Sequence, residues 1–68
     1  MIDPKYLFEL YDNISVLRLA DGQEVPAKTI SCNSYEETEI LGTKTYRIFT
    51  DSEIYTVKYS EVHKIHEL

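Results

Sequence analysis

The chain contains 68 residues, of which twelve are acidic and seven are basic, giving a formal net charge of −5. This length accommodates one domain, spanning residues 1–68, with a small hydrophobic core, and it excludes a multidomain protein. The acidic balance argues against a protein that derives its affinity from neutralising phosphates, because that requires a basic face. An acidic small domain more often meets a basic protein surface.

The single cysteine, Cys32, excludes an intramolecular disulfide and favours a reducing compartment. The first residues contain no basic region followed by an apolar run, so we expect no signal peptide. No apolar stretch approaches the roughly 20 residues that a membrane-spanning helix needs. We therefore expect a cytoplasmic protein that does not engage a membrane.

The first predicted element is a short helix over residues 4–11. Asp3 is a favourable N-cap, and Pro4 at the first helical position loses no hydrogen bond. Four apolar side chains then follow at helical spacing: Leu7, Leu10, Tyr11 and Ile14. We expect this face to pack across a sheet.

From residue 14 onward the pattern changes to β. Residues 15–20 alternate as a strand, and Asp21-Gly22 is a strong hairpin signal before a return strand over residues 23–32. Proline cannot donate to a ladder, so Pro26 predicts an edge strand or a bulge. The change of apolar phase between Ala27 and Ile30 predicts a bend near residues 28–29.

The second half of the chain predicts further short strands. Residues 33–43 are either an acidic loop or the tip of two long strands, and both interpretations stay open. Alternation over residues 44–50 and 54–59 predicts two strands joined by a polar turn. After a break at Ser60-Glu61, residues 62–68 form a short final strand anchored by Val62 and Ile65. The predicted order is one helix followed by about five strands.

Two segments resemble the motifs of the Sm-like family. Ile14-Ser-Val-Leu-Arg-Leu-Ala-Asp-Gly22 with Val25-Pro-Ala-Lys-Thr-Ile30 resembles the first Sm motif, and Tyr55-Thr-Val-Lys-Tyr-Ser-Glu-Val-His-Lys-Ile65 resembles the second. The resemblance implies a mainly β fold, a small five-stranded Sm-like or SH3-like barrel with a short N-terminal α-helix. Within the family, the acidic balance is most similar to the small Sm-like inhibitors of the termination factor Rho. It is less similar to the ring-forming bacterial RNA chaperones.

The favoured hypothesis is a non-enzymatic binding module, a regulator or inhibitor that occupies a basic surface of a larger protein, such as a nucleic-acid-binding surface. Tyrosine and acidic side chains suit contact with an Arg/Lys-rich groove. The candidate partner-binding residues are Tyr35, Glu36, Glu37 and Glu39. The chain would then act as a monomer or a small homo-oligomer.

Two alternatives remain. One is an Sm-like RNA-binding ring, in which basic side chains contact phosphates and an aromatic ring stacks on bases. Its candidate residues are Lys44, Arg47, Lys58 and Tyr59. The other is a structural or assembly domain that packs through its helix or its Pro26 edge strand.

No motif predicts catalysis or a cofactor. His63 and His66 are three residues apart, and in a strand such side chains point to opposite faces, so we expect no metal site with Cys32. Cys32 has no local signature of a nucleophile, and a semi-buried structural thiol is the common role of such a residue. We expect neither an enzyme nor a bound cofactor.

Overall fold

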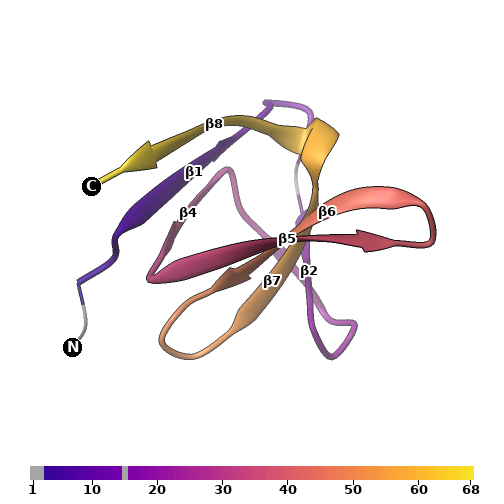
Figure 1. Ribbon diagram of the computed structural model, residues 1–68, viewed down its shortest axis with the longest axis horizontal. Coiled ribbons are helices and arrows are strands. Elements are labelled where there is room, and N and C mark those ends of the chain that lie inside the picture. The colour runs from indigo at the N-terminus through magenta and orange to yellow at the C-terminus, as the bar shows by residue number, and fades with distance from the viewer. Residues whose placement is uncertain (1–2, 15) are drawn as a thin grey trace.

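The computed structural model describes residues 3–14 and 16–68, and these residues form a mainly β protein (Figure 1). The strands are β1 (Tyr6–Leu10), β2 (Val16–Leu19), β3 (Glu24–Pro26), β4 (Thr29–Cys32), β5 (Ser34–Ile40), β6 (Thr43–Phe49), β7 (Ile54–Lys58) and β8 (Val62–Glu67). A single 3₁₀ turn, η1 (Tyr59–Glu61), lies between β7 and β8. The described residues contain no α-helix.

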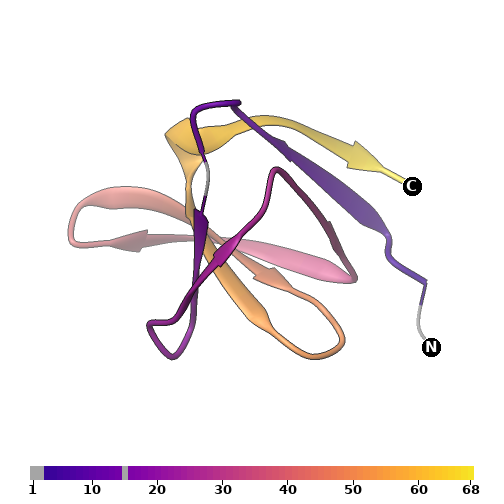
Figure 2. The same cartoon turned by 180° about the vertical axis from the view of Figure 1, so that it is seen from behind.

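The strands pair into two antiparallel sheets, seen from opposite sides in Figures 1 and 2. The smaller sheet has the order β4-β1-β8, and the larger has the order β3-β2-β7-β6-β5. The expected single closed five-stranded barrel is therefore wrong for the described residues, which form eight strands with no ladder joining the two sheets. The chain passes from one sheet to the other four times: between β1 and β2, at residues 27–28, at Asn33 and at η1.

The predicted N-terminal helix is also wrong, because this segment forms β1. The helical spacing of Leu7 and Leu10 competes with a second pattern, in which Tyr6, Phe8 and Leu10 alternate with period two. Aromatic residues favour strands, and β1 finds ladder partners on both of its edges, β4 and β8. Phe8, which the helix would have placed off its apolar face, is completely buried. Tertiary pairing therefore overrides the helix signals at Asp3 and Pro4.

The first hairpin follows the prediction. β2 and β3 pair around Asp21-Gly22, where Gly22 has a φ of 93° and the backbone N–H of Gln23 donates to Asp21 Oδ1 over 3.0 Å. Ser15, expected to start the first strand, lies outside the described residues. The predicted return strand is divided into β3 and β4, with the bend where it was expected. Pro26 lies on β3, an edge of the larger sheet, as the missing N–H requires.

Residues 33–43, left open between a loop and a hairpin, form an extended hairpin. β5 and β6 pair continuously from Ser34 opposite Phe49 to Ile40 opposite Thr43. The two-residue turn consists of Leu41 and Gly42, with φ values of 50° and 79°. Positive φ at both central positions is the type I′ geometry that matches the twist of a hairpin. The strands predicted over 44–50, 54–59 and 62–68 are confirmed as β6, β7 and β8.

Both sheets contribute to one hydrophobic core. Its buried residues share inward-facing strand positions: Phe8, Leu10, Leu17, Ile30, Cys32, Tyr46, Ile48 and Val57. Tyr35 joins the sheets through edge-to-face contacts with Tyr6 and Phe8, at ring-centroid distances of 5.0 and 5.1 Å, and with Tyr46 at 5.7 Å. Such aromatic pairs stabilise beyond the area that they bury, so this cluster connects β1 with the hairpin that carries the candidate site.

Candidate functional site

The four candidate partner-binding residues lie on β5, the outermost strand of the larger sheet. β5 is at the front of the view in Figure 1 and at the back in Figure 2. Side chains alternate along a strand, so Tyr35, Glu37 and Glu39 share one face and Glu36 lies on the other. The structure therefore places the four residues together on one strand but divides their side chains between two faces.

Tyr35 serves the core more than the surface. Its side chain is half-buried in the aromatic cluster described above. A ring held by three aromatic neighbours is rigid, which makes Tyr35 a support for β5. The three glutamates, in contrast, are all exposed.

The glutamates have different electrostatic surroundings. Glu36 Oε1 accepts from Arg47 Nη1 over 3.2 Å, an exposed ion pair. Glu39 lies directly opposite Lys44 in the ladder, and Glu37 lies opposite Tyr46. Burial, together with the neighbouring Tyr59 and Glu37, raises the pKa of Tyr46 to about 12. Glu37 and Glu39 make no ion pair within the described part of the chain, so their exposed carboxylates can contact a partner, although Glu37 also interacts with the Tyr46 hydroxyl.

The free edge of β5 also offers main-chain groups. Within residues 3–14 and 16–68, β5 pairs only with β6. In a two-residue hairpin the residues that flank the turn form a hydrogen-bonded pair, and such pairs alternate with non-hydrogen-bonded ones. Counting from Ile40, the residues whose N–H and C=O groups point away from β6 are Glu39, Glu37 and Tyr35. The edge thus combines unpaired backbone groups with negative side chains.

The four residues proposed for nucleic acid separate into two pairs. Lys44 Nζ lies 4.7 Å from the centroid of the Tyr59 ring, and that ring stacks on Tyr46 at 5.3 Å. Arg47 and Lys58 lie on the opposite face of the same sheet, because each directly follows an inward-facing residue in its strand, Tyr46 in β6 and Val57 in β7. One face of Tyr59 is therefore occupied by Tyr46, and the four side chains form no continuous basic track.

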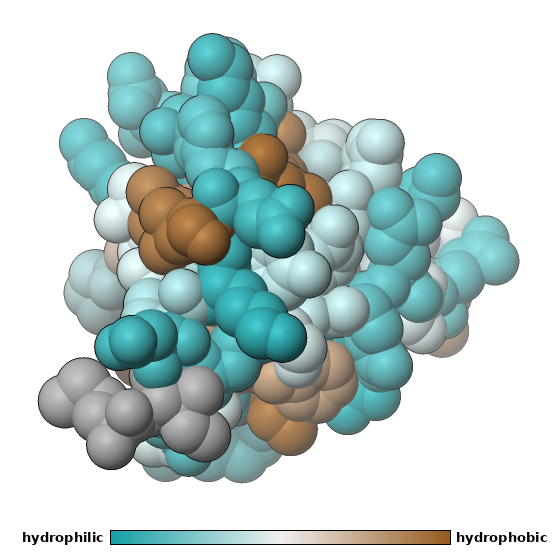
Figure 3. Space-filling view, turned by 60° about the vertical axis from the view of Figure 1, so that its left-hand side comes forward, coloured by the Kyte–Doolittle hydropathy of each residue, from teal (hydrophilic) through white to brown (hydrophobic). Residues whose placement is uncertain are grey.

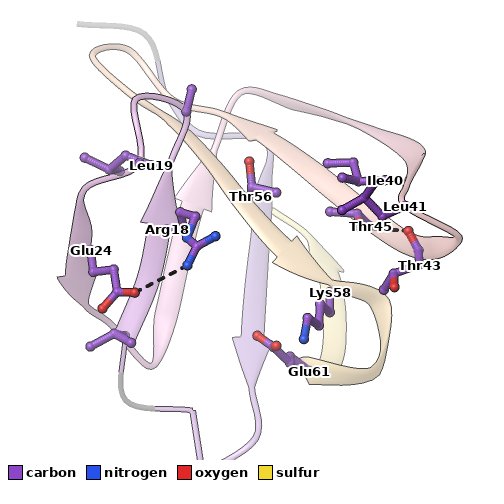
Figure 4. A pocket seen from close by; sticks show the side chains of 13 residues that line it. Arg18, Leu19, Glu24, Ile40, Leu41, Thr43, Thr45, Thr56, Lys58 and Glu61 are labelled. Carbon is purple, nitrogen blue, oxygen red and sulfur yellow. Dashed lines mark hydrogen bonds and ion pairs between the residues drawn. The ribbon is translucent and has the colours of Figure 1, made fainter.

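A groove that the sequence did not predict lies on the outward face of the larger sheet. It has a volume of about 650 Å³. In Figure 4 the tip of the β5–β6 hairpin forms one wall and β2 forms the other, with Thr56 and Lys58 of β7 between them. Thr45 also lines the groove but is itself buried, and its hydroxyl donates to the Thr43 carbonyl over 3.0 Å.

The other candidate chemical groups are dispersed. Cys32 is buried in the core, and that burial raises the pKa of its thiol. The His63 ring packs against Tyr11 with centroids 5.1 Å apart, whereas His66 Nε2 lies 3.1 Å from Glu9 Oε1 on the outer face of the smaller sheet. No group of three or more potential metal ligands occurs in the described parts of the chain, and no described helix is long and apolar enough to cross a membrane.

The surface near the chain termini is predominantly hydrophilic. In Figure 3 this side of the molecule shows apolar residues only as small patches among polar ones. The exposed large apolar side chains concentrate elsewhere, since three of the six in the described chain line the groove: Val16, Ile40 and Leu41.

Comparison with known proteins gave no match: no family model, no curated protein and no solved structure is significantly similar to this chain.

Proposed function

We propose that the chain is a non-enzymatic regulatory module that binds a basic, extended segment of a larger protein along the free edge of β5. The observation that carries this proposal is the position of Glu37 and Glu39 on an edge strand whose outward main-chain groups have no ladder partner among residues 3–14 and 16–68. The buried thiol of Cys32, with its raised pKa, does not suit a nucleophile, which fits a binding role.

Strand addition is the physical mode that this edge favours. An extended peptide gains affinity from main-chain hydrogen bonds to a sheet edge and specificity from its alternate side chains. Opposite charges directly across a ladder are stabilising, so lysines or arginines at every second position would meet Glu37 and Glu39. The aromatic packing of Tyr35 holds the strand in place before the partner arrives.

The same charges disfavour pairing between two copies of this edge. Like charges directly opposite in a ladder are destabilising, and charged side chains protect edge strands from aggregation. Two β5 edges would bring glutamates against glutamates. The edge is thus selective for a basic partner.

The Sm-like resemblance suggests a source for that basic segment. Small acidic members of that family cover a nucleic-acid-binding surface on another protein, and such surfaces are rich in lysine and arginine. We include in the proposal that this chain is related to the Sm-like and SH3-like small barrels. The succession of β7, η1 and β8 fits the strand, one-turn break and strand of the second motif.

Affinity for a designed peptide tests the proposal. A fluorescent peptide of alternating lysine and valine should bind, and its affinity should fall as salt is raised because exposed charges are screened. The variant Glu37→Lys/Glu39→Lys should bind at least about tenfold more weakly, since two attractive cross-strand pairs become repulsive. Glu53→Lys/Glu67→Lys, with the same change of net charge at exposed positions off β5, is the matched control and should retain binding.

Three results would contradict the proposal. The first is equal loss of binding in both double variants, which would show that only net charge matters. The second is equal affinity for a peptide with glutamate in place of lysine. The third is preferential binding of oligouridine RNA that depends on Lys44 and Tyr59, which would favour the RNA-binding alternative.

A further inference from the structure

The outward face of the larger sheet is electrically neutral in an otherwise acidic molecule. A row of ladder partners crosses it: Glu24, Arg18, Thr56, Arg47 and Glu36. With Lys58 and Glu61 beside the groove, this face holds three basic and three acidic side chains. The remaining four basic and nine acidic residues therefore carry the whole formal charge of −5.

The charges on this face are held loosely. Arg18 Nη2 and Glu24 Oε1 are 3.7 Å apart and exposed, and the Arg47–Glu36 pair is exposed as well. Surface pairs of this kind contribute little to folding, so they can rearrange when another surface approaches. Two acidic copies of the chain repel each other least when these neutral faces meet.

Leu41 is the most unusual residue on this face. Its side chain is fully exposed, with a relative accessibility of 101%, and its backbone φ is 50°. A leucine is disfavoured in the left-handed region, where glycine or asparagine is the usual residue of a type I′ turn. Within the isolated chain this side chain buries no apolar surface, because it is fully exposed. Strained positions that persist are often sites of contact.

Leu41 stands at the rim of the groove. Figure 4 shows Ile40 and Leu41 along one wall, facing the wall formed by β2 across Thr56. An apolar projection and a cavity side by side on one face constitute a self-complementary surface, which is the requirement for a two-fold symmetric contact. The groove, about 650 Å³ in volume, is large enough to receive the hairpin tip of another molecule.

We propose that this groove face, defined by the groove, Val16, Ile40 and Leu41, is a self-association surface that binds a second copy of the chain. Leu41 of each copy enters the groove of the other. The site lies on the opposite side of the sheet from Glu37 and Glu39, so the dimer presents two β5 edges. This arrangement would let two basic segments bind at once, with the gain in avidity that linked sites provide.

Salt dependence separates this association from partner binding. Screening weakens the repulsion between two acidic copies, so added salt should strengthen self-association. The same salt should weaken binding of a basic peptide to β5. The two effects have opposite signs and can be measured on one preparation, so each proposal can fail without the other.

Sedimentation equilibrium of the wild-type chain, over concentrations from about 10 µM to 1 mM, tests the proposal. We expect a reversible monomer–dimer equilibrium that shifts to dimer with added salt. Leu41→Asn should weaken it at least about tenfold, as loss of a central apolar anchor does. Because asparagine suits this turn, Leu41→Asn should remain folded. Val16→Glu, which places two carboxylates on the facing surfaces, should also abolish the dimer.

Leu68→Asn is the control, since Leu68 is an exposed leucine away from the groove face, and it should leave the equilibrium unchanged. A wild-type chain that remains monomeric at the highest concentration would overturn the proposal. Equal association of the wild type and Leu41→Asn would overturn it too, as would a six- or seven-membered ring.

Discussion

Replacing Phe8 separates the strand that we observe from the helix that the apolar spacing suggests. In a helix over residues 4–11, Leu7 would face the core and Phe8 would lie off that face. In β1 the order is reversed: Phe8 is completely buried, and Leu7 is half-buried on the outer face of the smaller sheet beside His66. The two arrangements predict opposite rankings for alanine substitutions.

The magnitude follows from the contacts of the Phe8 ring. It packs edge-on against Tyr35 and Tyr46 at 5.1 and 5.5 Å, and Phe→Ala at such buried sites costs about 3–5 kcal/mol. A core in a domain of this size rarely supplies more than about 3–5 kcal/mol in total. Phe8→Ala should therefore be largely unfolded at 25 °C, whereas Leu7→Ala should lose about 1 kcal/mol.

Urea unfolding followed by far-UV circular dichroism measures this difference. Phe8→Leu, which keeps most of the volume, should remain folded with a loss of about 1–1.5 kcal/mol, so the free energy can be quantified even if Phe8→Ala has no folded baseline. A larger loss for Leu7→Ala than for Phe8→Leu would contradict the assignment of this segment to β1.

Three further perturbations test other parts of the structure. The pKa of Tyr46 is raised to about 12 in the folded chain, above the value near 10 expected in the unfolded chain. The contribution of the protonated Tyr46 hydroxyl to the free energy of unfolding should therefore be fully present below pH 10 and be lost as pH rises through 12. The loss should be about 1–3 kcal/mol in urea titrations and absent in Tyr46→Phe. Burial raises the pKa of the Cys32 thiol, so a thiol reagent at pH 8 should label it slowly in the native state and rapidly in urea; equal rates would contradict its burial. Leu41→Asn should raise the thermal midpoint of the monomer, because relief of backbone strain at this turn is worth about 0.5–1 kcal/mol; a lowered midpoint would contradict strain at Leu41.

Local patterns predicted the second half of the fold well. Period-two alternation located β6, β7 and β8, and Asp21-Gly22 located the first hairpin, because these signals depend on neighbouring residues. The prediction of a helix over residues 4–11 was wrong for the opposite reason. Their assignment depends on β4 and β8, whose pairing with β1 joins segments far apart in the sequence.

The candidate site was predicted only in part. The cluster of glutamates was visible in the sequence, but whether it formed a loop or an edge strand depended on Leu41 and Gly42 adopting positive φ. Leucine is not a usual signal for that turn. The groove could not be predicted at all, because its walls come from β2 and from the tip of the β5–β6 hairpin, two segments that are far apart in the sequence.

Hydrogen exchange at the β5 backbone is the most direct test of the central claim that a basic segment adds to this edge. In the free protein the amides of Tyr35, Glu37 and Glu39 point away from β6 and should exchange quickly. On saturation with the alternating lysine–valine peptide, NMR should show these three amides becoming protected, while those of β3, at the opposite edge of the sheet, remain unchanged. Binding of the peptide with no added protection on β5, or with protection confined to β3, would contradict strand addition at this edge.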